Sequence, residues 1–223
     1  IVSSKPQTTR NRIMGVMNEE DVQVVFVDTP GLHLPKTKLG DYMQKSASSA
    51  IYDVDVILMV VEPDKKLHPA EADLLEKLPS VGLPCILVIN KTDIASPAAI
   101  AGTIELYRDA KFSAVVPLSA KTGDGVAILK EEILKHISEG VAFFPSDAIT
   151  DQPERSMVAE IIREKALRML DKEVPHGIAV YISSFNERAD GVVEIMADIY
   201  CEKQSHKGII IGKGGEMLKK IAT

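Results

Sequence analysis

Three short polar loops each follow a strand-like run of apolar residues, and their residue types suit the binding of phosphates and a purine base. They are Asp28–Gly31 (DTPG), Asn90–Asp93 (NKTD) and Ser119–Lys121 (SAK). Ligands of open α/β sheets bind beyond the carboxyl ends of the strands, which is where these loops are expected. Each loop alone could be an ordinary polar turn. Three of them in this order, each directly after a predicted strand, indicate one nucleotide site.

The DTPG loop carries residues suited to a metal-bound phosphate. An aspartate at a strand end can hold Mg²⁺ through water, and a glycine three residues later lets a backbone N–H approach a γ-phosphate. We therefore predict that the loop binds the phosphate end of the nucleotide. The candidate residues are Asp28, Thr29, Pro30 and Gly31.

The NKTD and SAK loops carry residues suited to guanine. The carboxylate of Asp93 can accept hydrogen bonds from N1–H and the 2-amino group of guanine, and adenine lacks this donor pair. Asn90 can tie its loop to a neighbour, and the stem of Lys91 can cover the base face. The backbone N–H of Ala120, between Ser119 and Lys121, could meet the guanine O6. The expected cofactors are GTP or GDP with Mg²⁺.

The elements that must position these loops alternate between strand and helix patterns. Runs rich in β-branched residues predict buried strands, and the stretches between them predict helices, so we expect a doubly wound, mostly parallel α/β sheet. An acidic turn between short apolar runs predicts a hairpin at 12–25. The strands are expected within 22–28, 55–63, 84–91 and 113–121, and the helices within 39–54, 68–82, 98–111 and 125–140.

The alternation of strand and helix patterns ends at residues 141–153. This stretch contains prolines and acids and has no clear hydrophobic period, so we interpret it as a linker. An amphipathic helix is expected at 154–170 and paired strands at 177–185 and 192–202. Residues 203–223 read as helix, glycine turn, helix. The order indicates a small α+β module.

The glycine cluster Gly212–Gly215 (GKGG) differs from a nucleotide phosphate loop, because no buried strand precedes it and Glu216 follows it. Glycines at both ends of a turn between helices let the backbone, and the start of the second helix, approach nucleic-acid phosphates. A plain helix hairpin closed by glycines is the alternative, and Ile210, Ile211 and Ile221 are expected to be mainly core. The candidate RNA-binding residues are Ile211, Gly212, Lys213, Gly214, Gly215, Lys219 and Lys220.

Charge and cysteine content narrow the function classes. The formal net charge of −6 argues against nonspecific binding of polyanions by the whole chain. Residues 154–223 carry eleven basic and eleven acidic side chains, and residues 203–223 carry five lysines against one acid.

No apolar run is long enough for a transmembrane helix. Two cysteines without a CxxC pattern argue against a zinc site and suit a reducing compartment.

The ordered loops resemble the DxxG, NKxD and SAK motifs of the translation-factor-related GTPases, and residues 3–13 (SSKPQTTRNRI) resemble their switch I. The resemblance implies that Thr9 (or Thr8) ligates Mg²⁺ directly and Asp28 ligates it through water. Thr9, Asp28 and Gly31 would then be the catalytic residues. The residue after DTPG is Leu32, which cannot orient a water by hydrogen bonding, so slow intrinsic turnover is expected.

Residues 210–221 (IIGKGGEMLKKI) resemble the signature of KH domains, which bind single-stranded RNA or DNA. A GTPase domain followed by a type II KH domain resembles the Era family over essentially the whole chain. The resemblance implies GTP hydrolysis, binding of small-subunit ribosomal RNA, and assistance in assembly of the small ribosomal subunit. It also implies a cytoplasmic monomer with peripheral membrane association. The implied domains are 1–140 (GTPase), 141–153 (linker) and 154–223 (KH).

The sequence departs from this pattern in one respect, because GxxxxGK[ST] does not occur in it. We expect that loop before Ile1 and a further β element of the KH domain after Thr223. A chain that starts at Ile1 should bind GTP poorly. Two alternatives remain: an RNA-binding adaptor with a degenerate, non-hydrolysing G domain, and a ribosome or tRNA-modification GTPase with a different KH-like appendage. We also hypothesise that nucleotide state reorders Ser3–Arg12 and Asp28–Lys38 and thereby alters RNA binding.

Overall fold

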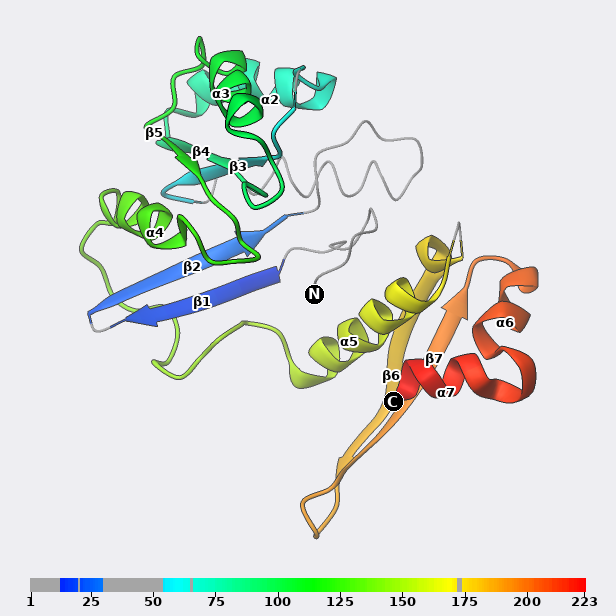
Figure 1. Ribbon diagram of the computed structural model, residues 1–223. Helices are drawn as coiled ribbons and strands as arrows, with labels where there is room; N and C mark the ends of the chain where they lie inside the picture. Colours follow the sequence, from blue (N-terminus) through cyan, green and yellow to red (C-terminus); the bar gives the residue numbers. More distant parts are fainter. Residues whose placement is uncertain (1–12, 20, 30–53, 65, 172–173) are drawn as a thin grey trace. The chain divides into compact units, whose positions relative to one another are not determined.

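The computed structural model describes residues 13–19, 21–29, 54–64, 66–171 and 174–223 (Figure 1). Contacts divide the described chain into two compact units. One contains residues 54–142, and the other contains residues 13–29 together with 143–223. The chain therefore leaves the second unit after the first hairpin and returns to it at residue 143.

The unit of residues 54–142 is built on a three-stranded parallel sheet with the order β3-β4-β5. The strands are β3 (Ile57–Val61), β4 (Cys85–Ile89) and β5 (Ala114–Pro117). Ile89 pairs with Val61 on one side and with Pro117 on the other. The carboxyl ends of all three strands therefore reach the same edge of the sheet, and the loops that follow them are neighbours.

Helices cover both faces of this sheet, with α2 (Pro69–Val81) and α3 (Pro97–Leu106) on one side and α4 (Val126–Leu134) on the other (Figure 1). Every residue of the central strand β4 is buried, as its unbroken apolar run predicts. The core between the sheet and the helices α2 and α3 is formed by Met59, Val61, Cys85, Leu87, Ile89 and Tyr107.

The hairpin expected at 12–25 is confirmed as β1 (Ile13–Glu19) paired antiparallel with β2 (Val22–Asp28). The prediction that 22–28 is a buried strand is wrong in the described structure, because its side chains are half-buried or exposed. Residues 148–151 are hydrogen-bonded to β1, with a bridge between Gly15 and Thr150, and residues 143–144 are bonded to Gln23 of β2. The segment that composition marks as a linker is thus hydrogen-bonded to the first hairpin.

The C-terminal module has the expected order of helix, two strands, helix, glycine turn and helix. Its core is formed by one face of the β6-β7 hairpin and three helices, and includes Ala166, Ile178, Ile210 and Ile221. The elements are α5 (Glu154–Met169), η1 (Pro175–Gly177), β6 (Ile178–Glu187), β7 (Val193–Cys201), α6 (Gln204–Ile211), η2 (Lys213–Gly215) and α7 (Glu216–Ala222).

The helix expected at 39–54 lies almost wholly outside the described residues, as do Thr9, Pro30, Gly31 and Leu32. Within the described part of the chain, no helix has the length and apolar character needed to cross a membrane.

Candidate functional sites

The loop Asn90–Asp93 begins where β4 ends, and Asn90 sets its shape. The backbone N–H of Asn90 donates to the carbonyl of Val61 at 2.8 Å, which extends the pairing of β4 with β3. Its side-chain oxygen accepts from the N–H of Lys91 at 2.8 Å. Lys91 has a φ of 66°, the only positive value at a non-glycine residue in the described chain. The asparagine side chain therefore stabilises a left-handed backbone turn that lysine rarely adopts.

Asp93 is held by the next loop along the sheet. The hydroxyl of Ser119 donates to its Oδ1 at 2.9 Å, and the ammonium of Lys121 lies 3.9 Å from its Oδ2. The side chain of Asp93 is 16% exposed, while Ser119 is 1% exposed. Since a buried hydroxyl fixes one oxygen, the carboxylate is oriented before any ligand binds.

Asn90 also joins the two loops, which is the tie that the sequence predicts for it. Its side-chain oxygen accepts from the N–H of Ala120 at 3.0 Å, and the N–H of Thr92 donates to the carbonyl of Leu118 at 3.2 Å. The N–H of Ala120, predicted to meet the guanine O6, is thus engaged by Asn90 in this structure. A base would share that donor or displace Asn90.

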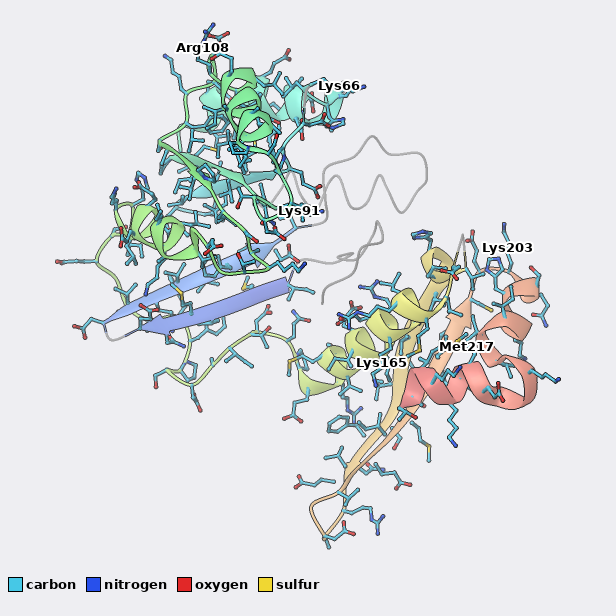
Figure 2. The ribbon with its side chains drawn as sticks, in the orientation of Figure 1. Lys66, Lys91, Arg108, Lys165, Lys203 and Met217 are labelled. Atoms are coloured by element: carbon cyan, nitrogen blue, oxygen red, sulfur yellow. The ribbon has the colours of Figure 1, made fainter. Side chains whose placement is uncertain are left out.

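Lys91 forms an ion pair with Glu62, the residue that follows β3. Both side chains lie at the edge where the parallel strands end, and Figure 2 shows Lys91 there. The pair is exposed, so it contributes little to stability. The pair places the ammonium of the lysine, whose stem is predicted to cover the base, beside the end of β3.

The loop after β5 depends on Gly125, a residue for which no sequence motif predicts a role. Gly125 has a φ of 79°, and a Cβ placed on it would lie 2.6 Å from the carbonyl oxygen of Pro117. The N–H of Ser119 donates to the carbonyl of Asp124 at 2.8 Å, which closes the loop. The GDG run at 123–125 is the sequence signal that could have indicated this tight return.

The DTPG loop is described only in part. Asp28 is the last residue of β2, exposed and paired with Ile13, and Thr29 is half-buried. The described residues contain no group of three His, Cys, Asp or Glu side chains that could hold a metal. An exposed carboxylate at a strand end is still a hard oxygen donor of the kind that Mg²⁺ binds through water. Asp28 therefore fits the role predicted for it.

The turn at Gly212–Gly215 requires its glycines for two different reasons. Gly212, Gly214 and Gly215 all have positive φ, at 74°, 60° and 83°. A Cβ on Gly212 would lie 2.7 Å from the Cβ of Met217, which packs against the core of this module (Figure 2). Gly214 and Gly215 have open space around them. The backbone of the turn is thus tightly packed at Gly212, and no side chain or neighbouring atom of the described residues covers it at Gly214 and Gly215.

Exposed apolar and basic side chains flank this turn. Ile210 and Ile221 are core as predicted, but Ile211 is 38% exposed, so the expectation that it is mainly core is wrong. Among the described residues, no acid forms an ion pair with any of the five lysines from 203 to 220, whereas Arg163, Arg168 and Arg188 of the same module are all paired. The exposed lysines are Lys203, Lys207, Lys213, Lys219 and Lys220.

Comparisons with known proteins match two parts of the chain to protein families. A family model described as "50S ribosome-binding GTPase" matches residues 1–91, and a KH domain model matches residues 173–223. GTPase Era of Ruminiclostridium cellulolyticum is 48% identical over 224 residues, which cover 100% of this chain and 75% of the relative.

Two solved structures of Era are similar over nearly all of this chain. One is Era in complex with MgGDPNP and nucleotides 1506–1542 of 16S ribosomal RNA, with a TM-score of 0.92 and 35% identity over 100% of this chain and 76% of the other. The second is an Era variant from Aquifex aeolicus bound to GDP and AlF4⁻, with a TM-score of 0.92 and 36% identity over 99% and 76%.

The fold and the two sites define a GTPase domain joined to a KH domain. The family is specified by a relative that is 48% identical over the whole chain and by a solved structure with a TM-score of 0.92. The chain belongs to the Era family of GTPases.

Proposed function

We propose that this protein binds small-subunit ribosomal RNA under the control of GTP and assists assembly of the small ribosomal subunit in the cytoplasm. The observation that carries the proposal is the pairing, on one chain, of an oriented Asp93 carboxylate with a glycine turn flanked by lysines that no described acid neutralises. The first selects a guanine nucleotide, and the second suits a phosphate backbone.

Guanine selection follows from the way Asp93 is held. One carboxylate oxygen accepts from the hydroxyl of Ser119, so the carboxylate is fixed in direction while part of it stays accessible. A guanine satisfies this acceptor with N1–H and its 2-amino group. An adenine would leave the largely buried acceptor without a donor, at a cost of about 1–3 kcal/mol or more for the charged group.

The phosphate end of the nucleotide is assigned to Asp28, Thr29, Pro30 and Gly31, with Thr9 as the second oxygen donor to Mg²⁺. The Mg²⁺ ion neutralises charge on the phosphates when it is bound. Asp28, at the end of β2, would hold the ion in place through a bound water.

RNA binding is assigned to the turn and the basic side chains around it: Ile211, Gly212, Lys213, Gly214, Gly215, Lys219 and Lys220. Gly214 and Gly215 present backbone without a Cβ to an open surface. Exposed Ile211 offers an apolar surface to a base, and the lysines offer charge to phosphates. This combination suits single-stranded RNA, whose bases are accessible.

The test is RNA affinity measured by fluorescence anisotropy with an oligonucleotide of the 3′ end of small-subunit RNA. Lys213→Asp should weaken binding at least about tenfold and flatten its salt dependence, because one phosphate contact is lost and repulsion is added. Lys111→Asp changes the same charge on an exposed residue of the other unit and should leave affinity within about twofold. Equal affinities for the two variants would overturn the RNA site.

The role in assembly has a separate test. Cells depleted of the protein should accumulate incompletely processed small-subunit RNA, and the Lys213→Asp protein should fail to restore processing. Normal small subunits in depleted cells would contradict the proposed role, while leaving RNA binding itself intact.

A further inference from the structure

The side-chain amide of Gln23, on β2, forms four hydrogen bonds, and three of them hold residues 143–144. Its oxygen accepts from the backbone N–H of Phe143 at 2.8 Å and from that of Phe144 at 2.9 Å. Its nitrogen donates to the carbonyl of Phe144 at 2.9 Å and to the Oδ1 of Asn18 at 2.7 Å. A primary amide offers two donors and two acceptor lone pairs, so all four are satisfied.

The other end of the same segment is attached to β1. Asn18 donates its side-chain N–H to the carbonyl of Ala148 at 3.0 Å, and the N–H of Val16 donates to the carbonyl of Ile149 at 2.9 Å. The hydroxyl of Thr150 donates to the carbonyl of Met14 at 2.6 Å. We call these contacts between the β1-β2 hairpin and residues 143–151 the hairpin clasp.

The hairpin clasp depends on hydrogen bonds more than on apolar burial. Phe143 is 83% exposed and Ile149 is 73% exposed, although their backbones are both held by the hairpin. A hydrogen-bonded pairing fixes the position of a segment along the strand, because each donor has one specified acceptor. The segment therefore cannot slide along β1 without losing several bonds at once.

Both partners of the clasp continue directly into functional parts of the chain. Ile13 is the last residue of the segment that resembles switch I, and Asp28 begins the DTPG loop. Residue 151 is separated from α5, the first helix of the KH module, by Gln152 and Pro153 alone. A displacement of the hairpin would therefore also move the start of α5, because only two residues connect the segment to this helix.

We propose that the hairpin and residues 143–151 move as one body, and that this body transmits the nucleotide state of the GTPase site to the KH module. The inference rests on the proposed function, since it requires RNA binding that responds to nucleotide. Gln23 is a positioning residue in this scheme. It contacts neither ligand and acts by holding the segment that leads to α5.

The clasp itself is tested by amide hydrogen exchange on this chain. The N–H groups of Phe143 and Phe144 should be protected in the unchanged protein and should lose protection in Gln23→Ala. Gln152→Ala is the matched control, because the side chain of Gln152 donates to Asp151, whereas the bond from the N–H of Met14 to Asp151 at 3.3 Å does not need Gln152. Rapid exchange of both amides in the unchanged protein would overturn the inference.

The transmission is tested by RNA affinity of the full-length protein with a GTP analogue and with GDP. The ratio of the two dissociation constants measures the coupling. Addition of RNA must change the preference of the protein for the GTP analogue over GDP by the same factor. Gln23→Ala and Thr150→Val should both bring the ratio at least about threefold closer to one, while Gln152→Ala should preserve it. Circular dichroism confirms that each variant is folded.

The outcomes separate the inference from the proposed function. Suppose that the folded variants Gln23→Ala and Thr150→Val keep the ratio of RNA dissociation constants of the unchanged protein. The clasp would then not be the transmitting element, and nucleotide-controlled RNA binding would remain in place. A ratio of one in the unchanged protein would overturn nucleotide control, and the inference with it.

Discussion

The hydroxyl of Ser119 donates to the carboxylate of Asp93 at 2.9 Å, although the two residues lie on loops that follow different strands. The parallel register of β4 and β5 brings these loops together, because Ile89 pairs with Pro117. The bond is nearly inaccessible to water at Ser119. It orients the group predicted to distinguish guanine from adenine.

Ser119→Ala should lower the affinity of the full-length protein for GDP at least about tenfold. The substitution removes a hydrogen bond to a charged and largely buried oxygen, which is worth about 1.5–3 kcal/mol. Isothermal titration calorimetry measures the change. Thr122→Val, which removes a hydroxyl bonded to Asp124 in the same loop, should have little effect on GDP affinity. Equal losses from the two substitutions would contradict the assignment.

Gly125→Ala should destabilise the unit of residues 54–142 by about 2–4 kcal/mol, because it combines a positive φ with a clash against backbone. Gly123→Ala is the comparison, since Gly123 also has a positive φ but has no atom within 4 Å of its Cβ position. It should cost about 1–2 kcal/mol. Urea unfolding measures both, and a Gly123 variant as unstable as the Gly125 variant would exclude the clash as the cause.

Gly212→Ala and Gly215→Ala should separate packing from backbone strain in the KH module. A Cβ at Gly212 meets Met217, whereas a Cβ at Gly215 meets nothing. We expect Gly212→Ala to lower the free energy of unfolding at least about 1 kcal/mol more than Gly215→Ala does. Thermal unfolding provides the measurement. The reverse order of stabilities would show that the described turn is not the one adopted in solution.

The stability of the protein should fall between pH 9 and pH 11 in part because of Cys85. Burial raises the pKa of its thiol from 9.0 to about 11, against a smaller lowering effect of a backbone hydrogen bond involving Met59. The folded state thus keeps a proton that the unfolded state loses above pH 9, so about 2–3 kcal/mol of stability is lost across this range. Cys85→Ala should show a shallower loss in denaturant titrations at pH 8, 9, 10 and 11. An equally steep loss would exclude the thiol.

Several features of the fold could be predicted from the sequence because they depend on local patterns. The buried run at Cys85–Ile89 and the glycine turn at Gly212–Gly215 are confirmed as strand and turn. A motif at a strand end also specifies which residues meet a ligand, because parallel strands end at one edge. Asn90 and Ser119 are connected to the neighbouring loops as that argument requires.

Other features depend on partners far apart in the sequence. Gln23 and Phe144 are joined across 121 positions, and no periodicity indicates such a pairing. The role of Gly125 depends on the carbonyl of Pro117, which only the folded loop brings near. The exposure of Ile211 depends on which face of α6 packs against the core. The neighbouring residue Ile210 is also an isoleucine, but it is buried.

The account depends most on the assignment of Asp93 as the guanine-selecting residue, and Asp93→Asn in the full-length protein tests it directly. An asparagine can donate to the 2-oxo group of xanthine, so the variant should lose at least about a hundredfold in affinity for GDP and gain affinity for XDP. Competition binding with the two nucleotides measures the ratio. The predicted result is a reversal of preference from GDP to XDP, and a variant that still prefers GDP would contradict the assignment.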